Sequence, residues 1–380
     1  MTAPQSKVDI AAVVSCLAER ESSPNQGRKR RVRVVEVISG LGLGGAERAL
    51  ARRLEFAPGS VETHVVVTGP DSSHLSTVVR GRSEFHQPRG SLVGAIQGLR
   101  PDLVISHNPR ETIRLLNQRR IAEESRVVVV AHNEISSEDP LKGFVLDRLL
   151  PVMNARAWRH LAVSSRAASG AQCRGATDVR VTLLGGSHDD HCQIRRDLWP
   201  PETKHRVAVV GRFSPQKNLP RLLRAVKSAH RNLSTAGVHL LLVGDGPEEK
   251  VLRSLIRDLE ISEVVSVHGW VDPADGVIAA ADTLLIPSVA EGGPLTLFEA
   301  LLAGTRVMST PVGASSDVLI RDDQSLTLEG SDRQSLSEGL LALANQSPVG
   351  QVERNSRRHR FRTLDVRSCA ANFYELLEVE

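Results

Sequence analysis

The stretch Ser288-Val289-Ala290-Glu291-Gly292-Gly293-Pro294-Leu295-Thr296-Leu297-Phe298-Glu299-Ala300 follows a short apolar run at residues 283–287. A buried strand, a glycine-containing loop and an apolar helix, in this order, form the repeating unit of a doubly wound parallel sheet. Gly292 and Gly293 permit a ligand to approach the backbone closely. The stretch therefore predicts both an α/β fold and a ligand site at the start of a helix.

The polar residues of this stretch suit a nucleotide-sugar. Pro294 fits the first helical turn, and the free N–H groups from Leu295 onward, at the positive end of the helix dipole, favour a pyrophosphate. Glu299, further along the helix, can accept hydrogen bonds from two ribose hydroxyls, and Glu291 in the loop can reach hydroxyls of the sugar. A surface carboxylate and a capping carboxylate are the alternatives for either residue taken alone.

A second polar cluster lies upstream, where the apolar run at residues 206–210 ends in Gly211-Arg212-Phe213-Ser214-Pro215-Gln216-Lys217-Asn218. Arg212 can bind phosphate oxygens through forked hydrogen bonds, and Lys217 can act as a point charge. Fixed cations of this kind neutralise a departing diphosphate without solvent reorganisation. The alternative is a surface loop that carries two ordinary cations.

Two glycine turns complete the set. Gly244 begins Gly-Asp-Gly-Pro after the apolar run at residues 238–243 and suits close packing near the nucleotide. Gly269 and Trp270 follow the run at residues 264–268 and suit backbone hydrogen bonding to a base edge, with Trp270 beside the base. Glycines between a strand and a helix are common, so neither turn is specific alone.

Apolar runs and amphipathic segments alternate along the whole chain, which indicates two doubly wound Rossmann-like domains. The expected strands cover residues 33–38, 63–68, 103–106, 126–131, 161–164, 179–184, 206–210, 238–243, 264–268, 283–287 and 306–309. The expected helices cover residues 46–56, 91–99, 110–123, 219–232, 248–259, 274–281, 295–303 and 365–377. We expect the carboxyl ends of the two sheets to face each other across a cleft.

The alternation breaks at a polar stretch around Pro200-Pro201, which divides the chain. The predicted parts are a mobile N-terminal extension, an acceptor-side domain, a linker, a nucleotide-sugar-binding domain and a C-terminal helix that returns to the first domain. They span residues 1–31, 32–190, 191–205, 206–355 and 356–380.

Composition excludes several classes of protein. The chain has 380 residues, 41% of them hydrophobic, which is enough for two packed cores. A single Tyr and seven Phe, without basic clusters between them, argue against nucleic-acid binding. Residues 1–200 hold 28 Lys and Arg against 21 Asp and Glu, which suits an anionic partner or an ordinary solvated surface equally well.

The ordered set of motifs, Gly-Arg-x4-Lys-Asn, Val-Gly-Asp-Gly-Pro, His-Gly-Trp-Val, Pro-Ser-x2-Glu-Gly-x6-Glu-Ala and Ala-Gly-Thr-Arg-Val, resembles the donor domain of the retaining GT-B glycosyltransferases of family four. The resemblance covers roughly residues 32–320 and is specific at residues 207–313. It implies that Glu291 contacts the donor sugar, Glu299 the ribose, and Arg212 and Lys217 the diphosphate. It also implies a retaining, metal-independent reaction with a nucleoside diphosphate sugar, for which we expect no cofactor.

The first half carries weaker signals. Gly44 and Gly45 belong to a loop that resembles the family's N-domain loop beside the donor phosphates, and its glycine spacing departs from a dinucleotide fingerprint. His132 follows a predicted strand and is expected to polarise or orient substrate oxygens, as general catalysis by histidine requires. His107 ends the preceding strand and ranks second, and a loop histidine bonded to the backbone is the alternative for His132.

No metal site is expected. The four cysteines are far apart and form no metal-binding or disulfide pattern, which suits a reducing cytosol. His188-Asp189-Asp190-His191 has metal-ligand residue types but stands where the resembled family has an Asn-Gly-x-Asp turn. Gly185-Gly186 replaces the expected Asn-Gly, and we interpret the segment as a hinge turn.

The acceptor is the least specified part of the prediction. The chain is expected to be a cytoplasmic hexosyltransferase that uses a UDP-sugar as donor. The expected acceptor is a hydroxyl of a sugar, glycolipid or small molecule in bacterial envelope or specialised metabolism. Arg114, Arg119 and Arg120 share a predicted helix that either contacts anionic lipid or a phosphorylated acceptor, or is a solvated face. Peripheral membrane contact stays open. The alternatives are an epimerase or phosphorylase of the same fold, or a non-catalytic partner subunit.

Overall fold

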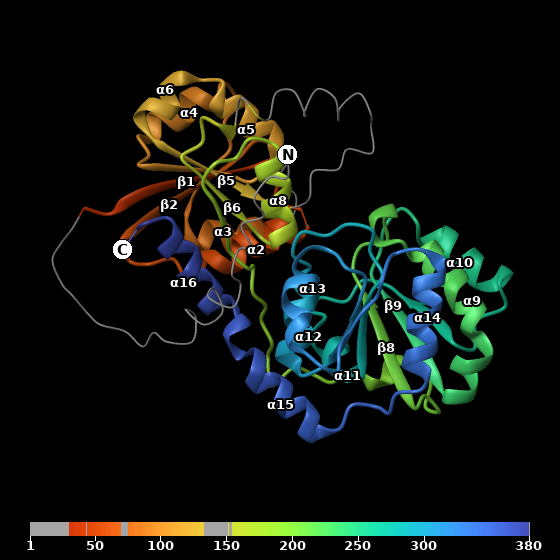
Figure 1. The fold of residues 1–380 in the computed structure, drawn as a ribbon. Helices are drawn as coiled ribbons and strands as arrows, with labels where there is room; N and C mark the ends of the chain where they lie inside the picture. Colours follow the sequence, from red (N-terminus) through yellow and green to blue (C-terminus); the bar gives the residue numbers. More distant parts are fainter. Residues whose placement is uncertain (1–29, 43, 70–74, 133–150, 152–153, 380) are drawn as a thin grey trace, which may run out of the picture. The chain divides into compact units, whose positions relative to one another are not determined.

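The computed structural model describes residues 30–42, 44–69, 75–132, 151 and 154–379 (Figure 1). The expected N-terminal extension lies outside this part, apart from residues 30 and 31. The chain divides into two compact units: unit 1 contains the chain up to Gly185 together with Val366 onward, and unit 2 contains Gly186–Asp365.

Unit 1 is built on a seven-stranded parallel sheet in the order β3-β2-β1-β4-β5-β6-β7. The strands are β1 (Val32–Ile38), β2 (Val61–Val67), β3 (Glu84–His86), β4 (Leu103–Ser106), β5 (Arg126–Ala131), β6 (Arg159–Ala162) and β7 (Val179–Val181). The central strands β1, β4 and β5 are rich in aliphatic residues because parallel strands are covered on both faces.

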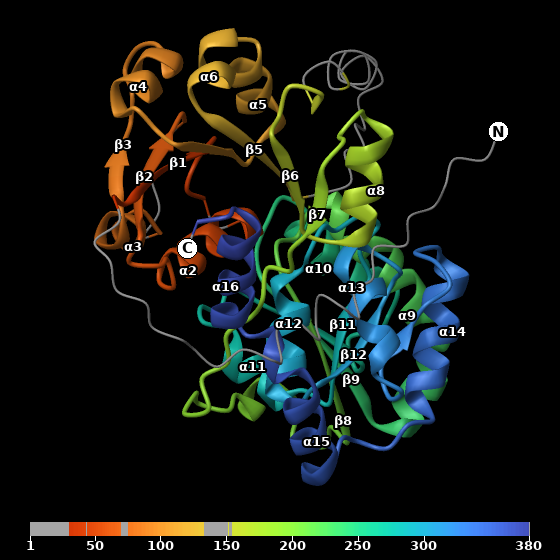
Figure 2. The ribbon, with the colours of Figure 1, turned by 60° about the vertical axis from the view of Figure 1, so that its left-hand side comes forward.

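Helices cover both faces of this sheet (Figure 2). One face packs against α4 (Leu92–Leu99), α5 (Pro109–Leu116) and α6 (Arg119–Glu124) through apolar residues that include Ile96 and Leu115. The other face packs against α2 (Gly45–Leu54), α3 (Leu75–Arg82) and α16 (Val366–Leu376). Helix α8 (Ser165–Cys173) packs beside β6 and β7.

Unit 2 has a six-stranded parallel sheet in the order β10-β9-β8-β11-β12-β13. Its strands are β8 (His205–Val210), β9 (Val238–Val243), β10 (Val265–His268), β11 (Thr283–Ile286), β12 (Arg306–Ser309) and β13 (Leu326–Thr327). The strand order reverses between β8 and β11, and ligands of open α/β sheets bind at such a reversal.

The helices of unit 2 form the second and third layers. One face of the sheet packs against α9 (Leu219–Ala236), α10 (Glu249–Asp258) and α14 (Arg333–Ala344), with a core that includes Leu223, Leu252 and Leu340. Its remaining helices are α11 (Asp275–Ala280), α12 (Leu295–Ala303), α13 (Gly313–Val318) and α15 (Gln351–Phe361), and α12 contacts both α11 and α15.

The predicted doubly wound architecture is confirmed, with local differences. The helix expected at residues 110–123 is two helices, because the turn at Asn117-Gln118 separates α5 from α6. The strand expected at residues 179–184 pairs over Val179–Val181 alone. Strand β3 was not predicted, since three residues carry no readable periodicity.

The division of the chain also differs from the expected one. Residues 191–205, expected as a linker, belong to unit 2, where the N–H of Arg195 donates to the carbonyl of Gly276 and Trp199 is buried. The chain passes between units at 185–186 and again at 365–366. Helix α15 belongs to unit 2, and α16 packs on unit 1 through Phe373 and Tyr374.

Candidate donor and histidine sites

The predicted donor residues of unit 2 follow the carboxyl ends of neighbouring strands. Gly211, Arg212 and Lys217 come after β8, and Glu291 comes after β11. Strands β8 and β11 pair directly, at the place where the strand order reverses. The βα loops of one sheet edge therefore carry these residues to one location.

An ion pair joins the two loops. The Nζ of Lys217 lies 2.6 Å from Oε1 of Glu291, and the hydroxyl of Ser288 donates to the same oxygen at 2.8 Å. Lys217 ends a 3₁₀ turn, Pro215–Lys217. The carboxylate and the ammonium, 74 positions apart in sequence, thus form one charged group at the sheet edge.

Backbone contacts fix these loops. The N–H of Val289 donates to the carbonyl of Gln216 at 2.9 Å, and the amide of Gln216 donates to the carbonyl of Ala290 at 2.6 Å. Asn218, which begins α9 in a left-handed conformation at φ 60°, donates from Nδ2 to Pro287 and to Ser331. The position of Lys217 is therefore set by the fold, as a preorganised site requires.

The glycine turns are required by close backbone contacts. Gly244 has φ 149°, and a Cβ there would clash with the carbonyl of Gly211. Gly211 has φ 148°, and a Cβ there would lie 3.2 Å from Cε of Lys217. A side chain at Gly244 would therefore displace the backbone of Gly211, and a side chain at Gly211 would displace Lys217. By contrast, a Cβ at Gly269 meets nothing within 4 Å.

The helix after β11 spans Leu295–Ala303 as predicted, but Pro294 is not part of its first turn. Pro294 has φ −64° and ψ 117° and is the N-cap, so the first helical residue is Leu295. The extended ψ of Pro294 places it just outside the helix rather than in the first turn. Glu299 lies on this helix, 7% exposed, and the helix packs so tightly on Gly186 that a Cβ there would lie 2.8 Å from the N of Glu299.

The remaining predicted donor residues differ in their exposure to solvent. Arg212 is exposed and lines a small pocket with Gly211, Lys217 and Ser288. Trp270 is 36% exposed after β10. Gly292 is buried and its carbonyl accepts from the N–H of Ala314, whereas Gly293 is partly buried.

In unit 1, the predicted glycine loop is the N-terminus of a helix. Gly44 is the N-cap of α2, has no capping side chain, and is exposed together with Gly45. A Cβ at Gly45 would meet nothing. At Gly44, by contrast, a Cβ would clash with the carboxylate of Glu47 in the first turn, so an anionic side chain already lies beside this exposed N-terminus.

The two rival histidines form one pair. The Nδ1 of His107 lies 2.9 Å from Nε2 of His132, and their rings stack with centroids 5.2 Å apart. On the other side of His107, Nε2 lies 2.7 Å from Oε2 of Glu36, whose second oxygen lies 2.9 Å from the guanidinium of Arg53. Tyr374 and Phe373 of α16 complete the group, the latter with its ring 3.7 Å from the Arg53 guanidinium carbon.

The hydrogen bonds define a chain of tautomers. An ionised Glu36 accepts from Nε2–H of His107, so the Nδ1 of a neutral His107 is an acceptor, and Nε2–H of His132 donates to it. Nδ1 of His132 then keeps its lone pair. Burial, then the electrostatic effect of the neighbouring His107 and Arg53, holds the pKa of His132 well below its usual value. His132 is therefore a neutral, oriented base at pH 7.

The pKa of Glu36, the carboxylate in this series of hydrogen bonds, is also shifted. Burial raises the pKa of Glu36, but Arg53 and the hydrogen bond from His107 outweigh it, so the pKa is lowered. Sequence reasoning missed both Glu36 and Arg53. The usable signal was the glutamate inside the apolar run Val34-Val35-Glu36-Val37-Ile38, because strands buried on both faces seldom carry an unpaired charge.

The segment at residues 188–191 does not gather metal ligands. Nε2 of His188 lies 3.1 Å from the guanidinium of Arg358, which also pairs with Asp190 at 2.9 Å. The guanidinium of Arg358 thus contacts both His188 and Asp190, at the position that a metal ion bound by these two side chains would occupy.

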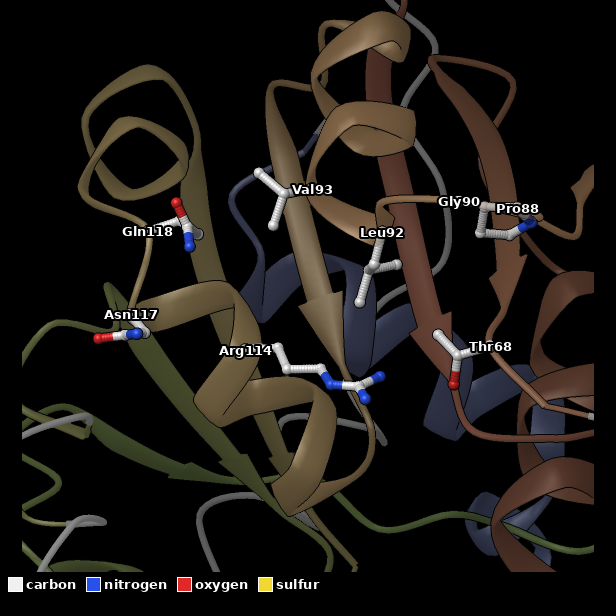
Figure 3. A pocket seen from close by; sticks show the side chains of 8 residues that line it. All are labelled: Thr68, Pro88, Gly90, Leu92, Val93, Arg114, Asn117 and Gln118. Atoms are coloured by element: carbon white, nitrogen blue, oxygen red, sulfur yellow. The ribbon is translucent and has the colours of Figure 1, made fainter.

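A hollow of about 350 Å³ lies near the carboxyl end of β2 in unit 1 (Figure 3). Arg114 extends from α5 toward Thr68, and its exposed guanidinium forms no ion pair with any residue within the described ranges. The other lining residues are Pro88, Gly90, Leu92, Val93, Asn117 and Gln118. The hollow thus combines apolar side chains, two side-chain amides and one cation.

Two parallel-sheet Rossmann-like domains with these loops define the GT-B class of fold. The family model for glycosyl transferases group 1 matches residues 191–362, so this part of the chain carries a domain of that family. Structures of similar fold include Anabaena HepE in complex with UDP, with a TM-score of 0.72 and 17% identity over 92% of this chain and 99% of HepE. Sucrose-phosphate synthase from Thermosynechococcus elongatus gives 0.73 and 15%, over 92% and 98%.

Curated relatives match over a shorter stretch. The lipopolysaccharide core biosynthesis glycosyltransferase LpsD of Rhizobium meliloti (strain 1021) is 30% identical over 149 residues, 39% of this chain and 42% of LpsD. The N-acetyl-alpha-D-glucosaminyl L-malate synthase of Bacillus anthracis is 25% identical over 178 residues, 46% of each chain. The chain thus spans less than half of the length of these relatives. No helix in the described ranges is long and apolar enough to cross a membrane.

Proposed function

We propose that this chain is a retaining glycosyltransferase that moves a sugar from a nucleoside diphosphate, a UDP-sugar, to a hydroxyl acceptor. The observation that carries the proposal is the joining of Lys217 and Glu291 where β8 meets β11. An ammonium and a carboxylate at this place match the two ends of a sugar diphosphate. The phosphates need a positive charge to neutralise them, and the sugar hydroxyls need a group that accepts their hydrogen bonds. HepE, of similar fold, was solved with UDP-glucose.

Each residue has a separate role in this proposal. Lys217 and Arg212 stabilise the departing diphosphate, Glu291 orients the sugar, and Glu299 binds the ribose. The N-termini of α12 and α2, with their exposed or loop glycines, supply N–H groups for the phosphates. None of these proposed roles needs a metal, because Arg212 and Lys217 would supply the positive charge.

His132 is proposed to act on substrate oxygens. The hydrogen bonds from His132 through His107 to Glu36 leave the lone pair of His132 on Nδ1. Burial and neighbouring charge lower the pKa of His132. A neutral imidazole at pH 7 can accept a hydrogen bond from a sugar hydroxyl and orient it. We place the residue at the reaction on this basis and on the family resemblance.

The hollow beside Arg114 is proposed to take part of the acceptor. Its mixed lining of Leu92, Val93 and the amides of Asn117 and Gln118 suits a sugar ring, and the guanidinium of Arg114 suits a phosphate or carboxylate. Three similar relatives are named for envelope polymers: lipopolysaccharide core, colanic acid and teichuronic acid synthesis. We therefore favour an anionic or phosphorylated envelope acceptor, which makes the enzyme cytoplasmic with peripheral membrane contact.

A screen of nucleotide-sugars tests the donor claim. Thermal unfolding of the purified chain is measured with UDP-, GDP-, ADP- and dTDP-sugars, and hits are confirmed by calorimetry. We expect stabilisation by a UDP-sugar and by UDP, because ligands that bind the folded state raise its melting temperature. A chain that binds no nucleoside diphosphate would be a non-catalytic subunit.

Product analysis separates the enzymatic alternatives. An epimerase converts the donor without an acceptor, and a phosphorylase requires inorganic phosphate. We expect transfer that depends on an acceptor, with retained anomeric configuration in the product. For the acceptor hollow, Arg114→Gln should raise the acceptor KM at least tenfold and leave the donor KM unchanged, with Arg110→Gln on the same helix as control.

A further inference from the structure

A second cluster of titratable side chains lies on the sheet of unit 1, and none of its residues is assigned to the donor or the acceptor. It is formed by β2 and the edge strand β3, which pair in parallel with His64 opposite Glu84. Glu84 and His86 are two residues apart on β3, so they share a face with His64. The pairing thus brings two imidazoles and one carboxylate together from sequence positions about 20 apart.

Their ligand atoms converge. Nδ1 of His64 lies 3.0 Å from Nε2 of His86 and 3.3 Å from Oε2 of Glu84, and the three atoms all lie within 4.8 Å of one another. A tetrahedral zinc ion with bonds of about 2.0–2.1 Å separates its ligand atoms by roughly 3.3 Å. Both distances from His64 are close to that edge length.

A second carboxylate fixes the orientation of the central histidine. Nε2 of His64 lies 2.9 Å from Oε1 of Glu62, and Glu62 is in turn held by the guanidinium of Arg33 at 3.1 Å. An ionised Glu62 accepts from Nε2–H, so Nδ1 of a neutral His64 directs its lone pair at His86 and Glu84. A carboxylate behind the ligating histidine is the usual support of a metal site.

Other histidine–carboxylate groups in the described ranges lack this arrangement. At His107 and His132, the single carboxylate lies behind His107 and is already paired with Arg53. At His188, the guanidinium of Arg358 faces the imidazole. Within the same ranges, three ligand atoms converge in the β2–β3 cluster alone.

We propose that His64, Glu84 and His86 bind one divalent transition-metal ion, for which zinc is the best match. Two imidazole nitrogens and a carboxylate oxygen are ligands that zinc prefers, and a water completes the tetrahedron. His64 is buried, whereas the side chain of Glu84 is 67% exposed, so the ion can enter from solvent. The ion ties the three-residue edge strand β3 to β2, and its test does not depend on the proposed transfer reaction.

The proposal is tested by titration of the untagged, chelator-treated full chain with zinc and, separately, with cobalt. We expect calorimetry to show one high-affinity zinc per chain and a rise in melting temperature that EDTA reverses. Cobalt should give visible absorption bands of a tetrahedral N/O site, displaced by zinc. Absence of stoichiometric zinc binding would overturn the proposal.

Variants separate this site from surface binding. Glu84→Gln changes an exposed side chain and should weaken zinc at least tenfold while the metal-free chain unfolds at an unchanged temperature. His86→Gln should abolish the cobalt bands, and Glu62→Gln should weaken zinc about 10–100-fold through His64. His230→Gln, which removes another histidine paired with a glutamate, is the matched control and should bind normally. Equal affinity in Glu84→Gln, His86→Gln and the unmodified chain would refute the assignment.

Discussion

The ammonium of Lys217 lies 2.6 Å from Oε1 of Glu291, although the two residues belong to different βα loops of unit 2. In the proposed reaction, a bound donor has to share or replace this contact. The lysine then faces the diphosphate, and the carboxylate becomes available to sugar hydroxyls.

The first prediction concerns Lys217. Lys217→Ala should lower kcat about 10²–10³-fold, because a fixed charge no longer stabilises the leaving diphosphate. Initial rates with saturating donor and acceptor measure the effect. Lys227→Ala, an exposed lysine on α9, is the control and should be fully active. Wild-type turnover in Lys217→Ala would contradict the assigned role.

The second prediction concerns Glu291. Glu291→Gln keeps the shape of the side chain but removes its charge. It should leave the affinity for free UDP within about threefold and lower the affinity for the UDP-sugar at least tenfold, because charge-assisted hydrogen bonds to the sugar are lost. Calorimetry with both ligands checks this. Parallel losses for UDP and UDP-sugar would instead place Glu291 at the nucleotide.

The third prediction contrasts two glycines. Gly244→Ala should destabilise unit 2 by about 2–4 kcal/mol. The positive φ of 149° is unfavourable for alanine, and the added methyl group would clash with the carbonyl of Gly211. Gly269→Ala, at the end of the neighbouring strand, has open space around it and should change stability by less than about 0.5 kcal/mol. Denaturant unfolding of the two variants measures the difference, and equal values would be inconsistent with this packing.

The fourth prediction concerns the buried pair in unit 1. Glu36→Gln should cost about 3–5 kcal/mol of unfolding free energy, because Arg53 is left charged without its carboxylate. The double variant Glu36→Gln with Arg53→Met should recover part of this loss. If the single variant is as stable as the parent, the pair does not contribute as described.

The fifth prediction concerns pH. Burial, partly opposed by Asp178, lowers the pKa of His160 on β6 to about 4. Below the ordinary pKa of 6.5, the unfolded chain therefore binds a proton that the folded chain does not, and stability falls as the pH drops from 6.5 to 4. The contribution approaches about 3 kcal/mol at pH 4.

Replacing that histidine tests the sign. His160→Leu should flatten the decline of unfolding free energy between pH 6.5 and 4 by about that amount, whereas His191→Leu at an exposed position should leave the curve unchanged. Urea unfolding at several pH values is the measurement. A steeper decline in His160→Leu would reverse the argument.

The donor motifs could be read from sequence because each lies in a single βα loop. The run ending at Val210 predicts where Lys217 must lie, and the run ending at Ile286 does the same for Glu291. Their contact depends on β8 and β11 being neighbours in the sheet. The alternation of strands and helices predicts a parallel sheet but does not specify the order of its strands. Pro294 was misplaced by one residue because proline is compatible with both the N-cap and the first turn.

Groups assembled from distant segments could not be predicted. His64 and Glu84 become neighbours through a three-residue strand that has no periodicity, and the cysteine spacing on which the metal prediction relied carries no information about them. Glu36 meets Arg53 across a strand and a helix, and Tyr374 joins them from 321 positions beyond Arg53. Such contacts depend on packing rather than on local pattern.

The return of α16 to unit 1 has a consequence for biogenesis. A ribosome synthesises Phe373 and Tyr374 after all of unit 2. Unit 2, which is continuous in sequence, can therefore complete its core while the core of unit 1 still lacks α16. Until then the guanidinium of Arg53 has no aromatic cover. The part of the chain that is made first is therefore the part that finishes folding last.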